Sequence, residues 1–300
     1  MITKLPAVLR YSLVGPITLA CAAVYGQQLE EVVVTAQKRE QSLQDVAISV
    51  AVISGTELEA LNKTQISDLP RLVPGFTFAS GTSDAGRSII IRGIGTQTFS
   101  RTVDQSVGTV VDGVAAGSVS GSILDFSDVE RIEVLRGPQG LLFGKNASAG
   151  LLSITTRGPT ETFTGGFGAA YGSVNLLNLN GYVSGPLVSD KLLGRLAVYR
   201  NTMDGMIENK YPGGEDFNDR DEWGARAKLQ SLLSEKIHAQ LSYVHAERDH
   251  NCCIGPLRNV TAGSVADREG GPRGSNAENV LDNDRSPGDT ELDSYALTLN

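Results

Sequence analysis

From about residue 163 onward, apolar and polar residues alternate in short stretches. In residues 223–230, for example, every second side chain is apolar, and the positions between them are charged, polar or glycine. Alternation with a period of two is typical of a β-strand that buries one face. The pattern predicts six such strands, whose apolar side chains are Phe167, Ala169 and Tyr171; Leu177, Leu179 and Val183; Leu192, Leu196 and Val198; Trp223, Ala225, Ala227 and Leu229; Ile237, Ala239, Leu241 and Tyr243; and Tyr295, Leu297 and Leu299.

The connections between these predicted strands differ in length. Residues 185–191 and 232–236 are predicted tight turns, whereas residues 201–221 and 249–290 are long and polar. Short turns that alternate with long loops are typical of outer-membrane β-barrels. A soluble β-sandwich also has alternating strands, but the pattern of connections favours the barrel.

Residues 43–158 have a different pattern, which predicts a compact α+β domain. Residues 48–54 indicate a strand, and residues 55–75 indicate two short helices. Continuous apolar runs bounded by glycine follow at residues 88–93, 107–115, 130–137 and 150–157. Such runs are typical of strands that are buried on both faces.

The first 26 residues have the pattern of a secretory signal peptide. A basic start and an apolar stretch at residues 11–24 precede Gly26, and Val24 and Gly26 are small enough for a cleavage site. The alternative is a short buried core helix, which Pro16 would break. We therefore expect residues 1–26 to be removed on export.

Composition excludes two classes of protein. The chain has 34 Asp and Glu against 26 Lys and Arg, a net charge of −8, and a nucleic-acid coat needs an excess of basic side chains. Outside the N-terminus no apolar run reaches the ~18 residues of a transmembrane helix.

The three histidines fall within residues 238–250 with no nucleophile elbow nearby, so an enzyme is not expected.

The glycine-rich stretch at residues 132–156 has a superficial likeness to a phosphate-binding loop. Gln139 stands where that loop needs its first glycine, and Asn146 stands where it needs Ser or Thr. The spacing therefore excludes a phosphate loop. The glycines need another explanation, such as tight turns and close backbone approach.

Six stretches of the chain resemble signature segments of one family. They are EVVVTA (31–36), SLQDVAISVAVISGTELEAL (42–61), DLPRLVPG (68–75), IIIRGIG (89–95), VVDGV (110–114) and VERIEVLRGPQGLLFGKNASAGLLSITTRGP (129–159). They are similar to the TonB-dependent outer-membrane receptors, in which an N-terminal plug fills a β-barrel. The last stretch is long and specific, and the resemblance covers essentially the whole mature chain.

The resemblance implies four parts: a signal peptide (1–26), a TonB box with a flexible linker (27–42), an α+β plug domain (43–158) and the first strands of a transmembrane antiparallel β-barrel (159–300). It also implies a set of plug-signature residues. They are Arg92, Gly93, Asp112, Gly113, Glu133, Arg136, Gly137, Pro138, Gly140, Gly144, Asn146 and Gly150. The last four glycines of this set are expected to be architectural, and the charges of Arg92, Glu133 and Arg136 to be buried and paired.

The segment Glu31-Val32-Val33-Val34-Thr35-Ala36 resembles a TonB box. A short β-branched segment between polar residues can add as a strand to the edge of another protein's sheet. The resemblance identifies that partner as TonB, which is driven by an inner-membrane motor complex. The alternative is a disordered tether without function.

Six strands do not close such a barrel. Plugged receptor barrels have about 22 strands, so about sixteen are missing, and an open sheet edge in lipid leaves unpaired backbone groups. We therefore expect a fragment or a truncated gene product that lies in the outer membrane with its plug on the periplasmic side.

The expected function is energy-coupled uptake of a scarce ligand, of the ferric siderophore, vitamin B12 or oligosaccharide class. The alternatives are a non-transporting module that binds TonB and a passive porin-like structural protein. No cofactor is expected.

Four residues near the C-terminus are of types that ligate zinc or copper: His245, His250, Cys252 and Cys253. Adjacent cysteines rarely ligate one metal together, and the spacing matches no established metal motif. A disulfide, either between the two cysteines or to another chain, is the favoured alternative in an oxidising compartment.

Overall fold

The computed structural model describes residues 33–34, 41–79, 87–96, 103–117, 125–189, 191–209, 212–234, 237–251, 263, 268, 279–280 and 289–299. All of them belong to one compact unit, Val33–Asn300. The predicted signal peptide lies outside the described residues, as do Glu31, Val32, Thr35, Ala36, Cys252 and Cys253. Within these ranges, no helix has both the length and the apolar character needed to cross a membrane.

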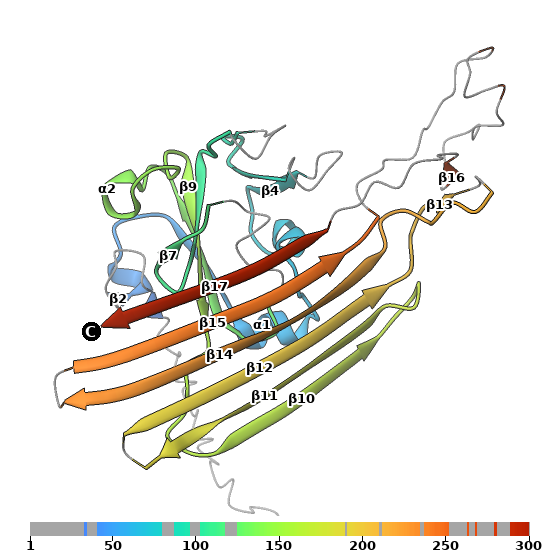
Figure 1. Cartoon of the computed structure of the whole chain (residues 1–300). Coiled ribbons are helices and arrows are strands. Elements are labelled where there is room, and N and C mark those ends of the chain that lie inside the picture. Colours follow the sequence, from blue (N-terminus) through green and yellow to red (C-terminus); the bar gives the residue numbers. More distant parts are fainter. Residues whose placement is uncertain are drawn as a thin grey trace, which may run out of the picture. The chain divides into compact units, whose positions relative to one another are not determined.

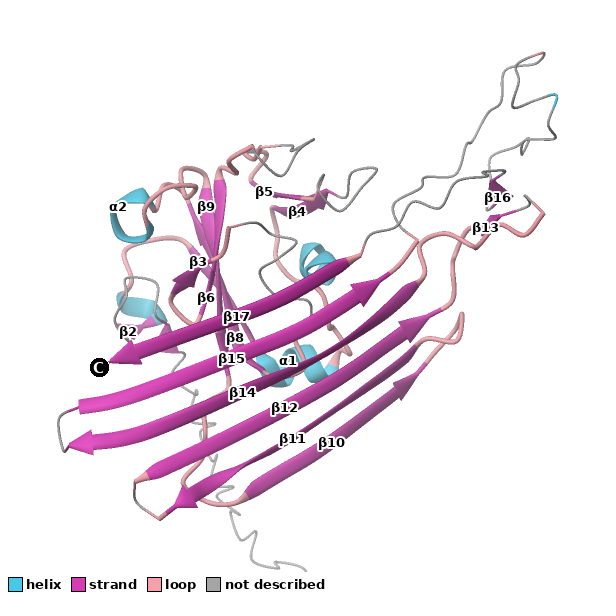
Figure 2. Cartoon of the chain, in the orientation of Figure 1, coloured by secondary structure: helices cyan, strands magenta, loops and turns pink. Residues whose placement is uncertain are grey.

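Residues 43–158, called the plug region from here on, contain a five-stranded mixed sheet, a two-stranded sheet and several short helices (Figures 1 and 2). In spatial order the strands are β3 (Val50–Ser54), β8 (Val129–Arg136), β9 (Gly150–Thr156), β6 (Val107–Val111) and β7 (Val114–Ala115). Helices α1 (Gly55–Ala60) and η2 (Ile66–Arg71) follow β3, and β4 (Phe76–Ala79) pairs with β5 (Ser88–Ile91). A short helix, α2 (Gly140–Phe143), lies between β8 and β9.

The predicted strands of the plug region are confirmed, with two differences. Residues 107–115 form the hairpin of β6 and β7 instead of one strand. Its turn is Asp112-Gly113, where both residues have positive φ, as a two-residue hairpin turn requires. Strand β4 was not predicted, because four residues directly after Pro74-Gly75 carry little periodic signal.

The central strands β8 and β9 are buried on both faces, as their continuous apolar runs predict. Ile132 and Ile154 belong to the larger apolar cluster, which also contains residues of α1 and η2. Leu135 and Leu151 belong to a second cluster with Val34. Because successive side chains of a strand point to opposite faces, the two clusters cover opposite faces of this sheet.

Three of the four plug glycines predicted to be architectural have a clear structural reason. Gly144 has a φ of +79°, a conformation that a side chain disfavours. A Cβ on Gly150 would lie 2.7 Å from the carbonyl oxygen of Leu135, which is too close. Gly137 also has positive φ. The prediction was wrong for Gly140, where a Cβ would meet no atom within 4 Å and φ is not positive.

Residues 164–299 form a second sheet of six antiparallel strands, called the wall sheet from here on (Figure 1). Its strands are β10 (Thr164–Tyr171), β11 (Leu177–Val188), β12 (Leu192–Met203), β14 (Arg220–Ser234), β15 (Ile237–Asp249) and β17 (Thr290–Leu299). Strand β13 (Glu208–Asn209) pairs in parallel with β16 (Asn279–Val280) outside this sheet, and this pair was not predicted. All six predicted strands are confirmed, and the described sheet is not closed.

Apart from Ile237, whose side chain lies outside the described part, the register places the predicted apolar side chains of the wall sheet on one face. One row of paired positions across the sheet is Val183, Leu196, Ala227, Tyr243 and Tyr295. This face is exposed: 46% of Leu196 and 73% of Tyr295 are accessible.

The neighbouring row, which points to the other face, is polar and buried. Its residues are Ser184, Arg195, Lys228 and Ser242, and each is at most 9% exposed. A soluble sandwich buries its apolar face, so the β-sandwich alternative is wrong. An apolar outer face with a polar inner face is the pattern of a transmembrane barrel.

Candidate functional site

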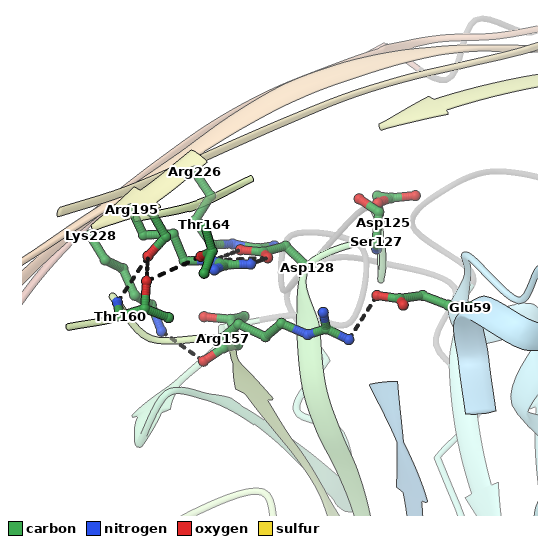
Figure 3. A network of polar contacts seen from close by, with 12 residues as sticks. Glu59, Asp125, Ser127, Asp128, Arg157, Thr160, Thr164, Arg195, Arg226 and Lys228 are labelled. Carbon is green, nitrogen blue, oxygen red and sulfur yellow. Dashed lines mark hydrogen bonds and ion pairs between the residues drawn. The ribbon is translucent and has the colours of Figure 1, made fainter. Parts of the chain in front are cut away.

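The plug region contacts the polar face of the wall sheet through charged and amide side chains, and this interface is the candidate functional site. At its centre lies Asp128, directly before β8 (Figure 3). Arg195 of β12 donates to Asp128 from Nε at 3.1 and 3.3 Å and from Nη2 at 2.5 Å. The guanidinium of Arg226 on β14 lies 3.9 Å from the same carboxylate. All three side chains are at most 8% exposed, so water screens these charges little.

Asp112 makes a second ionic contact with the wall sheet. Lys228 Nζ of β14 lies 3.0 Å from Asp112 Oδ2 and donates to the carbonyl oxygen of Thr156 at 3.0 Å. Asp112 also accepts from the backbone N–H and the hydroxyl of Thr156 at 2.8 and 2.6 Å. The plug-signature residue Asp112 thus joins the β6–β7 turn, the end of β9 and the wall sheet.

A buried carboxyl group without an ion pair lies nearby. Asp125 is 1% exposed, accepts from the backbone N–H of Ser127 at 2.7 Å and accepts from Asn201 Nδ2 of β12 at 2.8 Å. Burial raises the pKa of the Asp125 carboxyl, and the hydrogen bonds from Ser127 and Asn201 offset part of that rise. Burial favours its neutral form.

The first half of the plug region uses amide side chains instead. Gln65, at the start of η2, donates from Nε2 to both carboxylate oxygens of Glu222 at 3.1 Å and accepts from Arg220 at 2.9 Å. Asn178 Nδ2 of β11 donates to Asn62 at 3.4 Å. Glu222 itself is paired with Arg248 on the neighbouring strand, at 2.6 Å.

The two halves of the plug region are therefore attached differently. Of the described residues, those in 43–79 form no ion pair with the wall sheet, whereas Asp112 and Asp128 bind three wall cations. Breaking a buried ion pair by removal of one partner costs about 3–5 kcal/mol, because the other charge stays buried. A hydrogen bond to a charged group contributes about 1.5–3 kcal/mol. Among the described residues, the second half is thus the half that ion pairs join to the wall sheet.

The structure separates the three predicted plug charges. Glu133 is fully buried and paired, as predicted, but its partner is Arg131, at 2.9 Å. The prediction was wrong for Arg92, which is exposed. Arg92 and Arg136 each donate to Ser49 Oγ at 3.2 Å, and neither forms an ion pair with a described residue.

Other plug-signature positions lie in turns. Asn146 has positive φ and donates to Asp104 at 3.2 Å. Gly93 and Gly113 have positive φ, and Pro138 is exposed and lies two residues before α2. None of these side chains forms an ion pair with a described residue, and their positive φ values or exposed positions indicate that they shape turns.

Only two residues of the predicted TonB box are described, Val33 and Val34, which form β1. They pair with Gln41–Ser42, which is β2. Val34 is fully buried in the second apolar cluster of the plug region. In this state the Val34 side chain is not available to a partner.

Of the predicted metal ligands near the C-terminus, the two described residues, His245 and His250, do not come together. His245 lies on the exposed face of the wall sheet, at a position paired with Ala225 and Asp293. His250 is 6% exposed, and its Nε2 lies 3.4 Å from Arg87 Nη2. The structure therefore separates His245 from His250.

The comparisons with known proteins point to one family. Residues 42–151 match the family model of the TonB-dependent Receptor Plug Domain. The chain is 31% identical over 216 residues to the pesticin receptor of Yersinia pestis, a match that covers 71% of this chain and 31% of that protein. It is 28% identical over 230 residues to the vitamin B12 transporter BtuB of Photobacterium profundum, covering 74% and 36%. The chain spans about a third of the length of these relatives.

Solved structures agree. The ferric yersiniabactin uptake receptor FyuA from Yersinia pestis matches with a TM-score of 0.62 and 26% identity over 68% of this chain and 32% of that chain. The closed form of the ferric-catecholate import receptor Fiu from E. coli K12 matches with a TM-score of 0.66 and 19% identity, over 86% and 35%. At that identity the second match shows the fold alone.

Proposed function

Because the chain belongs to the TonB-dependent outer-membrane receptors, we propose that it supplies the plug and the first wall strands of a receptor for energy-coupled ligand uptake. The observation that carries this proposal is the buried ionic contact of Asp112 and Asp128 with Arg195, Arg226 and Lys228. It places a folded plug against the polar face of a sheet whose other face is apolar and exposed. A passive pore has no use for such a plug.

The site of action in this proposal is the outer membrane. Residues 1–26 direct export and are removed, residues 27–42 hold the TonB box, residues 43–158 are the plug, and residues 159–300 begin the wall. Relatives include an iron-regulated outer membrane virulence protein of Vibrio cholerae. The exposed apolar face of the wall sheet suits contact with lipid, and the plug faces the periplasm, where TonB can reach it.

The TonB contact requires release of β1. Strand addition uses the backbone and side chains of residues 31–36, yet Val34 is packed against Val110, Leu135, Ala147 and Leu151. Burial of a valine side chain contributes about 1.5–3 kcal/mol. Docking of β1 in the plug region therefore competes with its binding to TonB. In our proposal, ligand binding weakens the docked state and so favours binding of TonB.

Force on residues 31–36 would act first on the weakly anchored half of the plug region. It reaches β1 and β2 first and then β3, an edge strand of the five-stranded sheet. The ionic anchors at Asp112 and Asp128 lie in the other half. In our proposal residues 43–79 leave the wall during uptake while β8 and β9 stay.

The ligand in our proposal is a metal chelate of the ferric siderophore type. The relatives are described as a pesticin receptor, vitamin B12 transporters and a hemin receptor, and one similar structure is a ferric yersiniabactin receptor. All these relatives are transport receptors, which agrees with a protein that is not an enzyme. Vitamin B12 and oligosaccharides are the other outcomes of a ligand screen.

The test is uptake by cells that express a receptor containing these residues and a closed wall. Deletion of residues 31–36 should abolish uptake of a radiolabelled ferric chelate but preserve its binding to the cell surface. A protonophore should have the same effect on the unaltered receptor. Unchanged uptake after the deletion would support the porin-like alternative. TonB binding without any uptake by the unaltered receptor would support the non-transporting module.

The proposed movement has its own test. Ile53 of β3 and Ile154 of β9 are both at most 3% exposed, so Ile53→Cys and Ile154→Cys form a matched pair of thiol reporters. In energised cells with ligand, the thiol at position 53 should become reactive toward a membrane-impermeant label from the periplasm faster and more completely than the thiol at position 154, because β9 stays paired between β8 and β6. Equal labelling would contradict the difference in anchoring.

A further inference from the structure

A group of metal-ligating side chains lies on the exposed face of the wall sheet, opposite the face that contacts the plug region. His245 of β15 and the pair Glu291 and Asp293 of β17 each offer one ligand atom, and these atoms lie within 4.8 Å of one another. His245 Nδ1 is 3.1 Å from Asp293 Oδ1. We propose that these three side chains form a binding site for one first-row divalent transition ion of the Zn²⁺ class.

The register of the wall sheet builds this group. His245 is directly opposite Asp293, and Glu247 is directly opposite Glu291. Strands β15 and β17 are neighbours in the wall sheet (Figures 1 and 2). Side chains two residues apart on a strand share a face, so the pairing brings four donor residues to one face near the paired ends of the two strands. The sheet holds them in place without help from a loop.

The group has more carboxylates than cationic side chains, and this excess of negative charge is the second reason to expect a bound cation. Like charges directly opposite each other destabilise a strand pair, and Glu247 and Glu291 are such a pair. Asp293 adds a third carboxylate. Among the described residues, the cationic groups on this face near these carboxylates are the imidazole of His245 and the guanidinium of Arg200, and Arg200 is already paired with Asp221. The other donors to them, the Trp223 indole to Glu247 and the Tyr243 hydroxyl to Asp293, are neutral.

The donor set fits a transition ion better than calcium or magnesium. Imidazole nitrogen suits zinc, copper, iron and nickel, whereas calcium and magnesium prefer oxygen ligands alone. Zinc binds nitrogen and carboxylate oxygen at about 2.0–2.2 Å, which places neighbouring ligand atoms roughly 3–3.5 Å apart. The distance of 3.1 Å between His245 Nδ1 and Asp293 Oδ1 falls in that range. The Trp223 and Tyr243 hydrogen bonds orient the carboxylates.

A bound ion would fasten together two strand ends that are distant in sequence. Residues 250–289 connect β15 to β17, and His245 and Asp293 lie on either side of this connection. The ion would remove the repulsion between the facing carboxylates and stabilise the pairing of β15 with β17. The site is thus a structural one, and it is independent of the proposed uptake function.

The experiment is a calorimetric titration of the full chain in detergent micelles with Zn²⁺, after prior treatment with a chelator. The unaltered chain should bind one ion through this site. His245→Ala and Asp293→Asn should each weaken that binding by more than about tenfold, because each removes a ligand and the loss of a residue that merely orients a ligand already costs about 10–100-fold. Asp221→Asn is the matched control, because Asp221 lies on the same face in a separate pair with Arg200, and it should bind like the unaltered chain.

A second pair of measurements separates this site from the cysteines. The variant Cys252→Ser/Cys253→Ser should keep the binding. Thermal unfolding should shift upward with Zn²⁺ for the unaltered chain and for the cysteine variant, but not for Asp293→Asn, because an ion stabilises the state that binds it. Three results would overturn the proposal: no binding at millimolar Zn²⁺, affinity of His245→Ala and Asp293→Asn within twofold of the unaltered chain, or loss of binding in the cysteine variant alone.

Discussion

The substitution Asp128→Asn removes the central negative charge of the contact between the plug region and the wall sheet and changes the side-chain volume little. Arg195 and Arg226 then stay buried, at 4% and 8% side-chain exposure, without this counter-charge. Loss of one partner of a buried ion pair costs about 3–5 kcal/mol. We therefore expect the free energy of unfolding of Asp128→Asn to fall by about that amount.

The matched control is the ion pair between Arg200 and Asp221 on the opposite face. Its side chains are 42% and 49% exposed, and exposed ion pairs contribute about 0–1 kcal/mol. Asp221→Asn should therefore lower stability by no more than about 1 kcal/mol.

The assay is equilibrium unfolding of the full chain in urea in detergent micelles, followed by the fluorescence of Trp223, the single tryptophan. A double-mutant cycle with Arg195→Gln should give a coupling energy of about 1–3 kcal/mol, because the two residues are in direct contact. If Asp128→Asn were no more destabilising than Asp221→Asn, or if the cycle gave no coupling, the reasoning on the buried anchor would be refuted.

Three further predictions follow from the plug region. Burial raises the pKa of Asp125, so the contribution of its neutral carboxyl group to stability is full at low pH and is lost as pH rises through the raised pKa. When the free energy of unfolding is measured against pH, the unaltered chain should lose stability more steeply than Asp125→Asn. Parallel curves would contradict this. Val34→Ala removes about two buried methylene equivalents, which should weaken the docking of β1 by roughly 1.6 kcal/mol. Protease cleavage within residues 27–42 should therefore accelerate about tenfold. An unchanged cleavage rate would mean that Val34 does not hold the segment. Gly150→Ala forces a Cβ to 2.7 Å from a carbonyl oxygen and should lower the free energy of unfolding in urea by about 1–3 kcal/mol. The free energy of unfolding of Gly140→Ala should stay within about 0.5 kcal/mol of the unaltered chain. Equal effects of the two substitutions would contradict the packing argument.

The periodicity of the sequence was sufficient to predict the wall strands and their faces. A period of two marks which side chains share a face, so Leu196 and Tyr295 could be assigned to the same side before any contact was known. The same period does not say which face is outside. That became clear only from the burial of Arg195 and Lys228, which depends on contacts with the plug region.

The candidate site was only partly predictable. Asp112 was found because its motif resembles a family signature, and the Asp112-Gly113 dipeptide is itself a hairpin-turn signal. Asp128 and Arg195 were missed as partners because 67 residues separate them and no local pattern encodes such a contact. The expected burial of Arg92 was wrong because its apolar neighbours in sequence belong to a strand that ends before it.

The central claim is that one face of the wall sheet meets lipid while the other meets the plug, and brominated lipid tests it directly. Leu241 points to the exposed face of β15, and its neighbour Gln240 points to the other face. In a background with Trp223→Phe, a tryptophan would be introduced at one of these two positions in a receptor with a closed wall, reconstituted in bilayers. Brominated acyl chains quench only side chains that they touch, so the account predicts strong quenching for Leu241→Trp and little for Gln240→Trp. Equal quenching at both positions, or the reverse order, would contradict it.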